Sequence, residues 1–333
     1  QTGWWQSVAA GDFNGDGKLD LIAGNWGLNS SYHASADWPA RFYYGDFDDN
    51  GTVDIIEAED DSETKKIMPR RTKLVLGSAM PFVQAAYPTH KAYAVASVAD
   101  ILGDRMKRAR EVTVNTLSTM LWLNRGDHFE ATPLPVEAQF TPVSGISVAD
   151  LDGDGNQDIF LAQNQFAQRG EDPRQDAGRG LWLRGDGHGR FKAMPGEESG
   201  VKVHGEQRGS VAGDFDEDGR ADLVVTQNGA ATKVYHNTRA KAGLRVRLAG
   251  PPGNPDGVGA TVRAARGESF GPATEIHAGA GYWSQDTSVL VFAGATPTEI
   301  QVRWPGGKTV TAKIPAGMAE ISINEEGGVK VIR

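Results

Sequence analysis

Four short stretches of the chain repeat one pattern of oxygen-bearing side chains and glycine. Each follows D-x-[DN]-x-[DN]-G-x-x-D, with Asp or Asn at positions 1, 3, 5 and 9 and glycine at position 6. We name them loop A (residues 12–20), loop B (46–54), loop C (150–158) and loop D (214–222). Asp and Gly are common turn formers, so one such loop could arise by chance. Four copies, each followed by an apolar run, indicate a ligand.

The spacing of these oxygens suits a hard cation. Alternate side chains in a tight loop point to one centre, and glycine at position 6 allows the sharp turn. Carboxylate-rich sites with about six or seven flexible oxygen ligands favour Ca²⁺ over Mg²⁺. We therefore predict about four Ca²⁺ sites, with side-chain ligands at positions 1, 3, 5 and 9 and the backbone carbonyl of position 7. These ligands are Asp12, Asn14, Asp16, Lys18, Asp20, Asp46, Asp48, Asn50, Thr52, Asp54, Asp150, Asp152, Asp154, Asn156, Asp158, Asp214, Asp216, Asp218, Arg220 and Asp222.

The charge of the chain agrees with bound cations. Net charge is −9, and the predicted ligands include 14 of the 43 acidic side chains. Without metal, each loop would force like charges together at a repulsive cost. We therefore expect the metals to stabilise the fold, as ligands that bind only the native state do. The loops are not EF-hands, because their flanks are strand-like and the bidentate Glu at position 12 is missing, with Glu57 the one match by type.

The elements that hold these loops are predicted to be strands. Loops A, C and D each lie between a short apolar run and a second one that ends in Asn. Two further segments, 120–135 and 180–196, read as hairpins with a Gly-Asp turn, and 233–243 resembles the first half of a third. An acidic hairpin plus an outer hairpin makes a four-stranded unit, which is typical of a β-propeller blade.

Two regions depart from this repeat. Apolar residues recur at helical spacing within 92–106, so we predict a helical insertion at about 81–111 in a propeller region of residues 1–240. Residues 97–104 imitate the repeat, but Leu102 replaces the third-position ligand and no metal is expected there. Alternating runs between Gly/Pro turns from 243 to 333 predict a separate small β-sandwich or barrel. The fold class is therefore all-β.

Several classes of function are disfavoured. An acidic chain is a poor partner for nucleic acid, and no run of about 18 apolar residues could span a membrane. There is no cysteine, no HExxH motif and no GxSxG motif, so we assign no catalytic residue. The tripeptide RGD occurs at 125–127 and 184–186, where turn formation is the preferred interpretation over adhesion. The first residues already read as strand, which suggests a mature product or a piece of a longer polypeptide.

With these motifs in view, residues 1–240 resemble the FG-GAP/VCBS repeat proteins, which are integrin-α-like β-propellers with calcium in loops between strands. The four acidic loops, "GNWGLNS" and "LWLNRGDHF" carry the resemblance. The tail resembles the ASPIC/UnbV domain through "GLRVRLAGPPGNPDGVGATVRA", "EIHAGAGYWSQD" and "IQVRWPGGKT". The resemblance implies a secreted protein made as a signal-bearing precursor, in an extracellular, periplasmic or cell-surface location and often bacterial.

The resemblance leaves the blade number and the function open. Integrin-like propellers have about seven blades, whereas four calcium loops are found here. Either the chain follows an upstream part of a longer polypeptide, or it closes with fewer blades. The leading functional hypothesis is a calcium-binding adhesion or scaffold module with a protein or glycan ligand. The alternatives are a glycan lyase or hydrolase, or its accessory module, that uses the propeller face, and a structural module without a ligand of its own.

Overall fold

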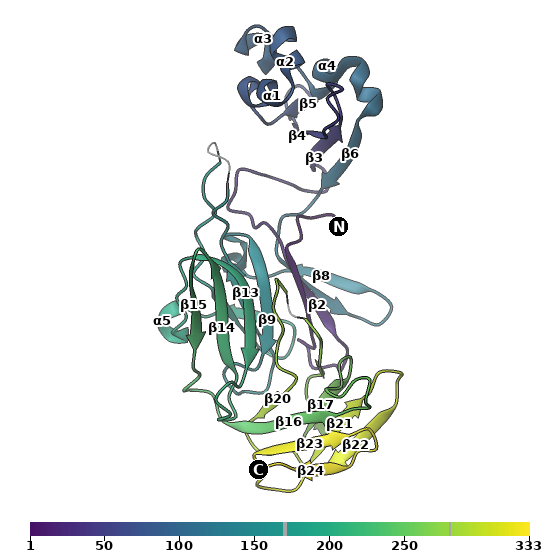
Figure 1. The fold of residues 1–333 in the computed structure, drawn as a ribbon, viewed down its shortest axis with the longest axis vertical. Coiled ribbons are helices and arrows are strands. Elements are labelled where there is room, and N and C mark those ends of the chain that lie inside the picture. The colour runs from purple at the N-terminus through teal and green to yellow at the C-terminus, as the bar shows by residue number, and fades with distance from the viewer. Residues whose placement is uncertain (169–171, 280) are drawn as a thin grey trace. The chain divides into compact units, whose positions relative to one another are not determined.

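The computed structural model describes residues 1–168, 172–279 and 281–333 (Figure 1). Residue 280, inside the predicted ASPIC/UnbV stretch, lies outside the described residues. The chain divides into two compact units. The small unit comprises residues 1–4 and 31–117, and the large unit comprises residues 5–30 and 118–333. Most of the regular secondary structure is strand, and the helices are few and short. The predicted all-β class is therefore confirmed.

Three antiparallel sheets of the large unit follow the predicted blade pattern, with an acidic hairpin beside an outer hairpin in the first two and beside a single outer strand in the third. The first blade contains β1 (Ser7–Gly11), β2 (Asp20–Gly24), β7 (Met120–Asn124) and β8 (Phe129–Pro133). The second contains β9 (Val143–Ala149), β10 (Asp158–Gln163), β11 (Leu181–Gly185) and β12 (Phe191–Ala193). The third contains β13 (Glu206–Gly213), β14 (Asp222–Asn228) and β15 (Ala230–Tyr235). Loops A, C and D join the first two strands of these blades.

Strand β10 shows why the blades stack. All six of its residues are buried. Because successive side chains of a strand point to opposite faces, one face can pack on each neighbouring blade. Ile159 and Leu161 join a core with residues of the first blade, whereas Phe160 joins a core with Leu223 and Val225 of the third. The continuous apolar run in the sequence is therefore the run of a two-sided buried strand.

The small unit has a sheet of its own, ordered β5–β4–β3–β6. Its strands are β3 (Ala40–Gly45), β4 (Asp54–Asp60), β5 (Ile67–Pro69) and β6 (Arg110–Val114), and loop B joins β3 to β4. Four short helices follow β5, namely α1 (Lys73–Ala79), α2 (Pro81–Ala86), α3 (His90–Ala94) and α4 (Val98–Leu102). Tyr43 and Ile56 of the sheet share one apolar core with Leu76 and Leu102 of the helices.

The imitation of the repeat at 97–104 is helical. Ser97 caps α4, its side chain and Asp100 forming a reciprocal capping box. The carboxylate of Asp100 is thereby used to start a helix.

The C-terminal sandwich (residues 243–333) packs two sheets around one core. One sheet contains β16 (Gly243–Ala249), β20 (Leu290–Ala293), β23 (Glu320–Asn324) and β24 (Val329–Val331). The other contains β17 (Thr261–Arg266), β18 (Ser269–Phe270), β19 (Thr274–Glu275), β21 (Glu299–Arg303) and β22 (Thr309–Lys313). Val246 and Ile321 from the first sheet meet Val262, Ile300 and other apolar side chains of the second in this core.

Short helices also occur in the large unit, η2 (Val136–Gln139) and α5 (Gly196–Ser199), and a 3₁₀ turn, η1 (Gly103–Arg108), closes the helical part of the small unit. Among the residues that the structure describes, no helix has the length and apolar character needed to cross a membrane.

Substitution of Phe160 tests the packing of β10 between blades. Phe160 is fully buried, so Phe160→Ala should leave a cavity and lower the free energy of unfolding of the large unit by about 3–5 kcal/mol. Denaturant titration with tryptophan fluorescence measures this loss. The control is Phe129→Ala on β8, where the ring is 48% exposed and the expected change is within about 0.5 kcal/mol. Equal losses in the two variants would contradict the assignment.

Candidate metal sites

The four acidic loops share one internal network of hydrogen bonds. In every loop the carboxylate at position 1 accepts the backbone N–H of the glycine at position 6, at 2.8–3.0 Å. The side-chain oxygen at position 5 accepts the N–H of position 7, at 2.8–2.9 Å. The position 6 glycines all have positive φ, between 81° and 86°, which other residues rarely adopt. The repeated sequence therefore specifies one repeated backbone turn.

The aspartate at position 9 connects each blade loop to its outer hairpin. Asp20, Asp158 and Asp222 are buried. In each, one carboxylate oxygen accepts the N–H of position 2 in the loop, at 2.9–3.1 Å. The other accepts an N–H at the end of the third strand of the blade or just beyond it, at 2.7–2.8 Å. In loop B, Asp54 accepts the N–H of Phe47 in the same way. The aspartate at position 9, which was predicted as a metal ligand, therefore links the acidic loop to the third strand by hydrogen bonds.

Three loops bring three carboxylates close enough together to hold a metal ion. The ligand atoms of each set lie within 4.8 Å of one another. The sets are Asp46, Asp48 and Asp54 in loop B, Asp150, Asp152 and Asp158 in loop C, and Asp214, Asp216 and Asp218 in loop D. Position 7 contributes no carboxylate, and the side chains of Lys18 and Arg220 at that position form ion pairs with the acids at position 5.

Loop A, where Asn14 stands in place of an acid, contains a buried carboxylate oxygen without a hydrogen-bond partner among the described residues. Asp12 is fully buried, and its Oδ2 accepts two backbone N–H groups, from Gly17 and Ala273, both at 2.8 Å. Its Oδ1 is buried and has no hydrogen-bond partner among the described residues. A buried carboxylate oxygen without a partner is costly, and a cation would satisfy it. Asp48 Oδ1 in loop B is in the same situation. These residues fit a bound metal ion.

The titration of the loop acids shows the cost of leaving them without metal. Burial raises the pKa of Asp158 to about 8, with repulsion from Asp152 and Asp150 adding to it. Burial and the neighbouring Asp154 and Asp152 raise the pKa of Asp150 to about 7. Burial is also the main cause that raises the pKa values of Asp12, Asp20, Asp54 and Asp152. At neutral pH loop C therefore favours a proton or a metal ion over bare charge at Asp150 and Asp158.

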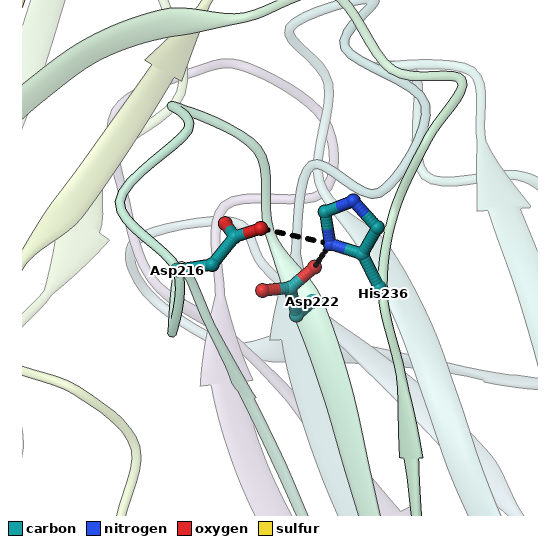
Figure 2. Close-up of side chains that lie close together, drawn as sticks. All are labelled: Asp216, Asp222 and His236. Carbon is teal, nitrogen blue, oxygen red and sulfur yellow. Dashed lines mark ion pairs between the residues drawn. The ribbon is translucent and has the colours of Figure 1, made fainter.

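The three blade loops differ in the side chain that the third strand places beside them. In each blade this is the residue immediately before the one whose N–H bonds to the position 9 aspartate. It is Leu123 in the first blade, Arg184 in the second and His236 in the third. Arg184, part of the second RGD tripeptide, forms ion pairs with Asp152 and Asp154 of loop C. His236 lies beside two aspartates of loop D (Figure 2).

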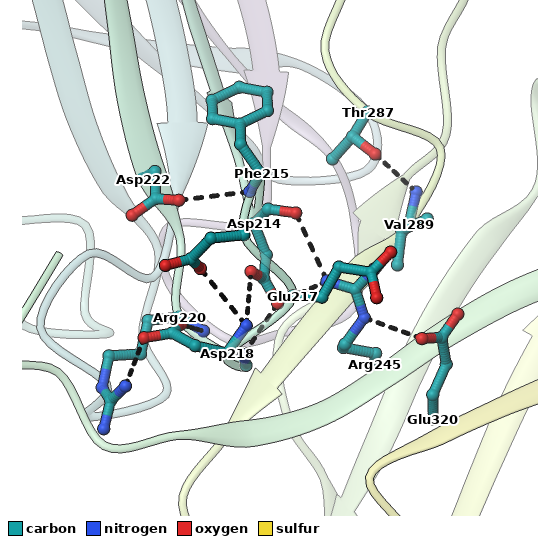
Figure 3. Close-up of polar contacts among 12 residues, drawn as sticks. Asp214, Phe215, Glu217, Asp218, Arg220, Asp222, Arg245, Thr287, Val289 and Glu320 are labelled. Atoms are coloured by element: carbon teal, nitrogen blue, oxygen red, sulfur yellow. Dashed lines mark hydrogen bonds and ion pairs between the residues drawn. The ribbon is translucent and has the colours of Figure 1, made fainter. Parts of the chain in front are cut away.

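Loop D also receives an arginine from the C-terminal sandwich (Figure 3). Arg245 on β16 is 3% exposed, and its guanidinium pairs with the carboxylate of Asp214 and, at 3.0 Å, with that of Glu320 on β23. Arg333 adds contacts to Glu320 at 3.2 Å and to Glu217 at 3.1 Å. A charge this deeply buried requires paired and hydrogen-bonded partners, and this network provides them. The acid at position 1 of loop D is thus neutralised from within the protein.

The ends of all three blade loops lie against the C-terminal sandwich. The side chain of Gln157 accepts the N–H of Asp12 at 2.7 Å and donates to the carbonyl of Ala273 at 3.1 Å. The glycine at position 6 of each blade loop lies so close to the sandwich that a side chain there would collide with it. An added Cβ would meet the side chain of Arg263 in loop A, that of Arg266 in loop C and the backbone of Gly243 in loop D. The residues that seat the sandwich on the loops, Arg245 and Gln157, were not predicted from the sequence.

The segment between β19 and β20 returns from the sandwich to the inner strands of the blades. Asp286 accepts the N–H of Ala212 on β13 at 3.1 Å and lies 3.5 Å from the ring of His277. The hydrogen bond to Asp286 raises the pKa of His277. A cavity of about 240 Å³ separates this segment from apolar residues of β1, β2 and β9, among them Val8 and Ile146. The chain's own C-terminal residues, Glu275, His277 and Asp286, therefore line one side of this cavity.

Comparison with known protein families agrees with this architecture. The FG-GAP repeat model matches residues 4–30, which span β1, loop A and β2. The model described as ASPIC and UnbV matches residues 250–330, most of the C-terminal sandwich. No curated protein sequence matches the chain significantly. The predicted pairing of an FG-GAP repeat region with a C-terminal ASPIC/UnbV domain is confirmed.

The raised pKa values predict how the stability of the metal-free protein depends on pH. Asp158 titrates near pH 8 in the folded state against an ordinary value of 3.8, so the folded state holds a proton that the unfolded chain has released. Stability in a chelator should therefore fall as the pH rises from about 4 to about 8 and then level off. Melting temperatures measured across this range should show a shallower fall in Asp158→Asn and an unchanged one in Asp127→Asn, whose carboxylate is 86% exposed. A melting temperature that rises over this range would contradict the assignment.

Proposed function

We propose that this chain, with its FG-GAP repeat and ASPIC/UnbV domain, is a calcium-stabilised binding or scaffold module that acts outside the cytoplasm. The observation that carries the proposal is the buried Oδ1 of Asp12, which has no partner among the described residues and lies in a loop with further oxygen ligands. Family resemblance supports the calcium and the extracytoplasmic location. The partner is a protein or a glycan that binds elsewhere on the surface.

Calcium would be held by the side chains at positions 1, 3, 5 and 9 together with the carbonyl of position 7. In loop A these are Asp12, Asn14, Asp16 and Asp20 with Lys18, and loops B and C use the corresponding residues. Hard oxygen ligands with a flexible backbone between them are what Ca²⁺ prefers. Each of these loops gathers carboxylates that are costly to bring together without a cation. We therefore assign calcium a role in stability.

The position of the loops explains why such a metal would act as a structural part. Loops A, C and D lie where the C-terminal sandwich or its linker contacts the blades, so a cation that orders them also orders the surface that receives the sandwich. Calcium binding and the docking of the sandwich are then linked, because each stabilises the same loop conformation. A module built in this way would present a rigid surface to its ligand.

Glycan recognition is the second candidate, either as binding alone or within a carbohydrate-active protein. The observation that favours it is Trp283, whose side chain is 93% exposed and whose φ of 48° is rare for such a residue. Tyr282 beside it is 49% exposed and lies near the guanidinium of Arg208. Exposed aromatic rings bordered by polar groups suit the apolar faces of sugar rings. Loss of glycan binding in Trp283→Ala, read on a glycan array, would support this candidate.

Removal of calcium tests the first proposal. The native protein should contain bound calcium, and chelation should lower its melting temperature, since saturation at about 100 times Kd stabilises a protein by about 2.7 kcal/mol per site. Asp12→Asn keeps the shape and the hydrogen-bond acceptor of the side chain but removes its charge, so it should reduce the calcium stoichiometry by one. Isothermal titration calorimetry and differential scanning calorimetry measure the two effects.

The matched control for this experiment is Asp127→Asn, which removes a carboxylate from an exposed turn of the same blade. It should leave both calcium stoichiometry and melting temperature unchanged. A purified protein without calcium, whose melting temperature does not respond to chelator or to added Ca²⁺, would refute the proposal.

A further inference from the structure

We propose that loop D and the end of β15 form a separate site for a divalent transition-metal ion of the zinc type, with Asp216, Asp222 and His236 as its protein ligands (Figure 2). This site differs from the oxygen-only sites in the other loops because it includes an imidazole nitrogen. It does not depend on calcium being bound elsewhere in the chain.

The geometry of the three side chains carries the first part of the argument. His236 Nδ1 lies 3.0 Å from Asp216 Oδ2 and 3.4 Å from Asp222 Oδ1, and all three ligand atoms are within 4.8 Å of one another. Two ligands at about 2.0–2.1 Å from a tetrahedral Zn²⁺ are separated by about 3.3 Å. The observed spacings lie on either side of that value, so an ion would enter with small adjustments of the side chains.

Ion pairs within loop D carry the second part. In the oxygen-only set of this loop, Asp214 is paired with the buried Arg245 and Asp218 with Arg220 (Figure 3). Two of its three carboxylates are therefore already neutralised by arginine. Among the ion pairs of the described residues, Asp216 and Asp222 contact only His236. The set that includes histidine is therefore the one whose carboxylates have no arginine or lysine partner.

Comparison of the blades carries the third part. The position of His236 at the end of the third strand is occupied by Leu123 in the first blade and by Arg184 in the second. Leucine cannot bind a metal ion, and arginine itself supplies the positive charge. Of the three blades in the described part of the chain, the one with loop D therefore combines an imidazole at this place with two loop carboxylates, Asp216 and Asp222, that pair with no arginine or lysine.

The chemistry of the ligand set selects the ion. Imidazole is a common ligand of Zn²⁺ and related transition ions, whereas Ca²⁺ takes oxygen ligands. His236 is about half exposed, so water can complete the coordination. The ion would fasten loop D to the end of β15. That strand is the outermost of the third blade, which has three strands in the described part of the chain, whereas the other two blades have four.

The test compares metal binding in the full-length chain and in two histidine variants, with the calcium sites first saturated by excess Ca²⁺. The wild-type protein should bind one equivalent of Co²⁺ with visible absorption bands, and Zn²⁺ should displace it. His236→Ala should lose these bands and weaken Zn²⁺ binding at least tenfold in calorimetry. His128→Ala should behave as wild type, because His128 is an exposed histidine 2.7 Å from one carboxylate oxygen of Asp127.

Circular dichroism and calcium stoichiometry identify a misfolded variant, and His236→Gln provides a second, milder change with the same expected loss. Equal Zn²⁺ affinity in the wild type, His236→Ala and His236→Gln would overturn the proposal. Displacement of Co²⁺ by millimolar Ca²⁺ would also overturn it, because loop D would then be an oxygen-only site. A protein that binds Zn²⁺ through His236 but no Ca²⁺ would support this inference while refuting the calcium proposal.

Discussion

The buried aspartate at position 9 is the residue on which the blades depend. One of its oxygens holds the acidic loop and the other holds the third strand, so a single carboxylate sets the register between an inner and an outer hairpin. Hydrogen bonds to a charged acceptor are stronger than neutral ones. The arrangement nonetheless places a carboxylate in a buried site next to other carboxylates, and burial raises the pKa values of Asp20 and Asp158 there. The positive side chains near the loops pair with the other acids around it, Lys18 with Asp16, Arg184 with Asp152 and Asp154, and Arg245 with Asp214.

The charge balance differs from loop to loop. In loop A one oxygen of the buried Asp12 has no hydrogen-bond partner among the described residues, in loop C an arginine of the same blade pairs with two of the acids, and in loop D a buried arginine of the C-terminal sandwich pairs with one of them. Similar backbone turns therefore hold different charge environments. The loops whose position 9 acids hold the blades together also contact the sandwich through their position 1 acids, Asp12 and Asp214.

Much of this could be predicted from the sequence, because the relevant information is local. The loop spacing, the strands beside it and the β character of the tail depend on neighbours along the chain. The roles of Arg245, Gln157 and His236 depend on contacts between residues far apart in sequence, which no periodicity reveals. One signal was available for His236. Aligning "LWLN" with "VYHN" places it opposite Leu123, at the point where the third strand meets its loop.

The connection between β2 and β7 has a further consequence. These strands are paired neighbours, with Ala23 opposite Met120, and the N–H of Asn25 donates to Thr119 Oγ1 at 3.2 Å. For the first blade, residues 31–117, which make up most of the small unit, lie within a hairpin connection whose two ends are already together. The free-energy cost of closing a connection grows slowly with its length, by about 0.6 kcal/mol for each doubling. The connection between β2 and β7 is therefore a suitable site for domain insertion. Another folded domain could replace the present one there without a change in the strands of the blade.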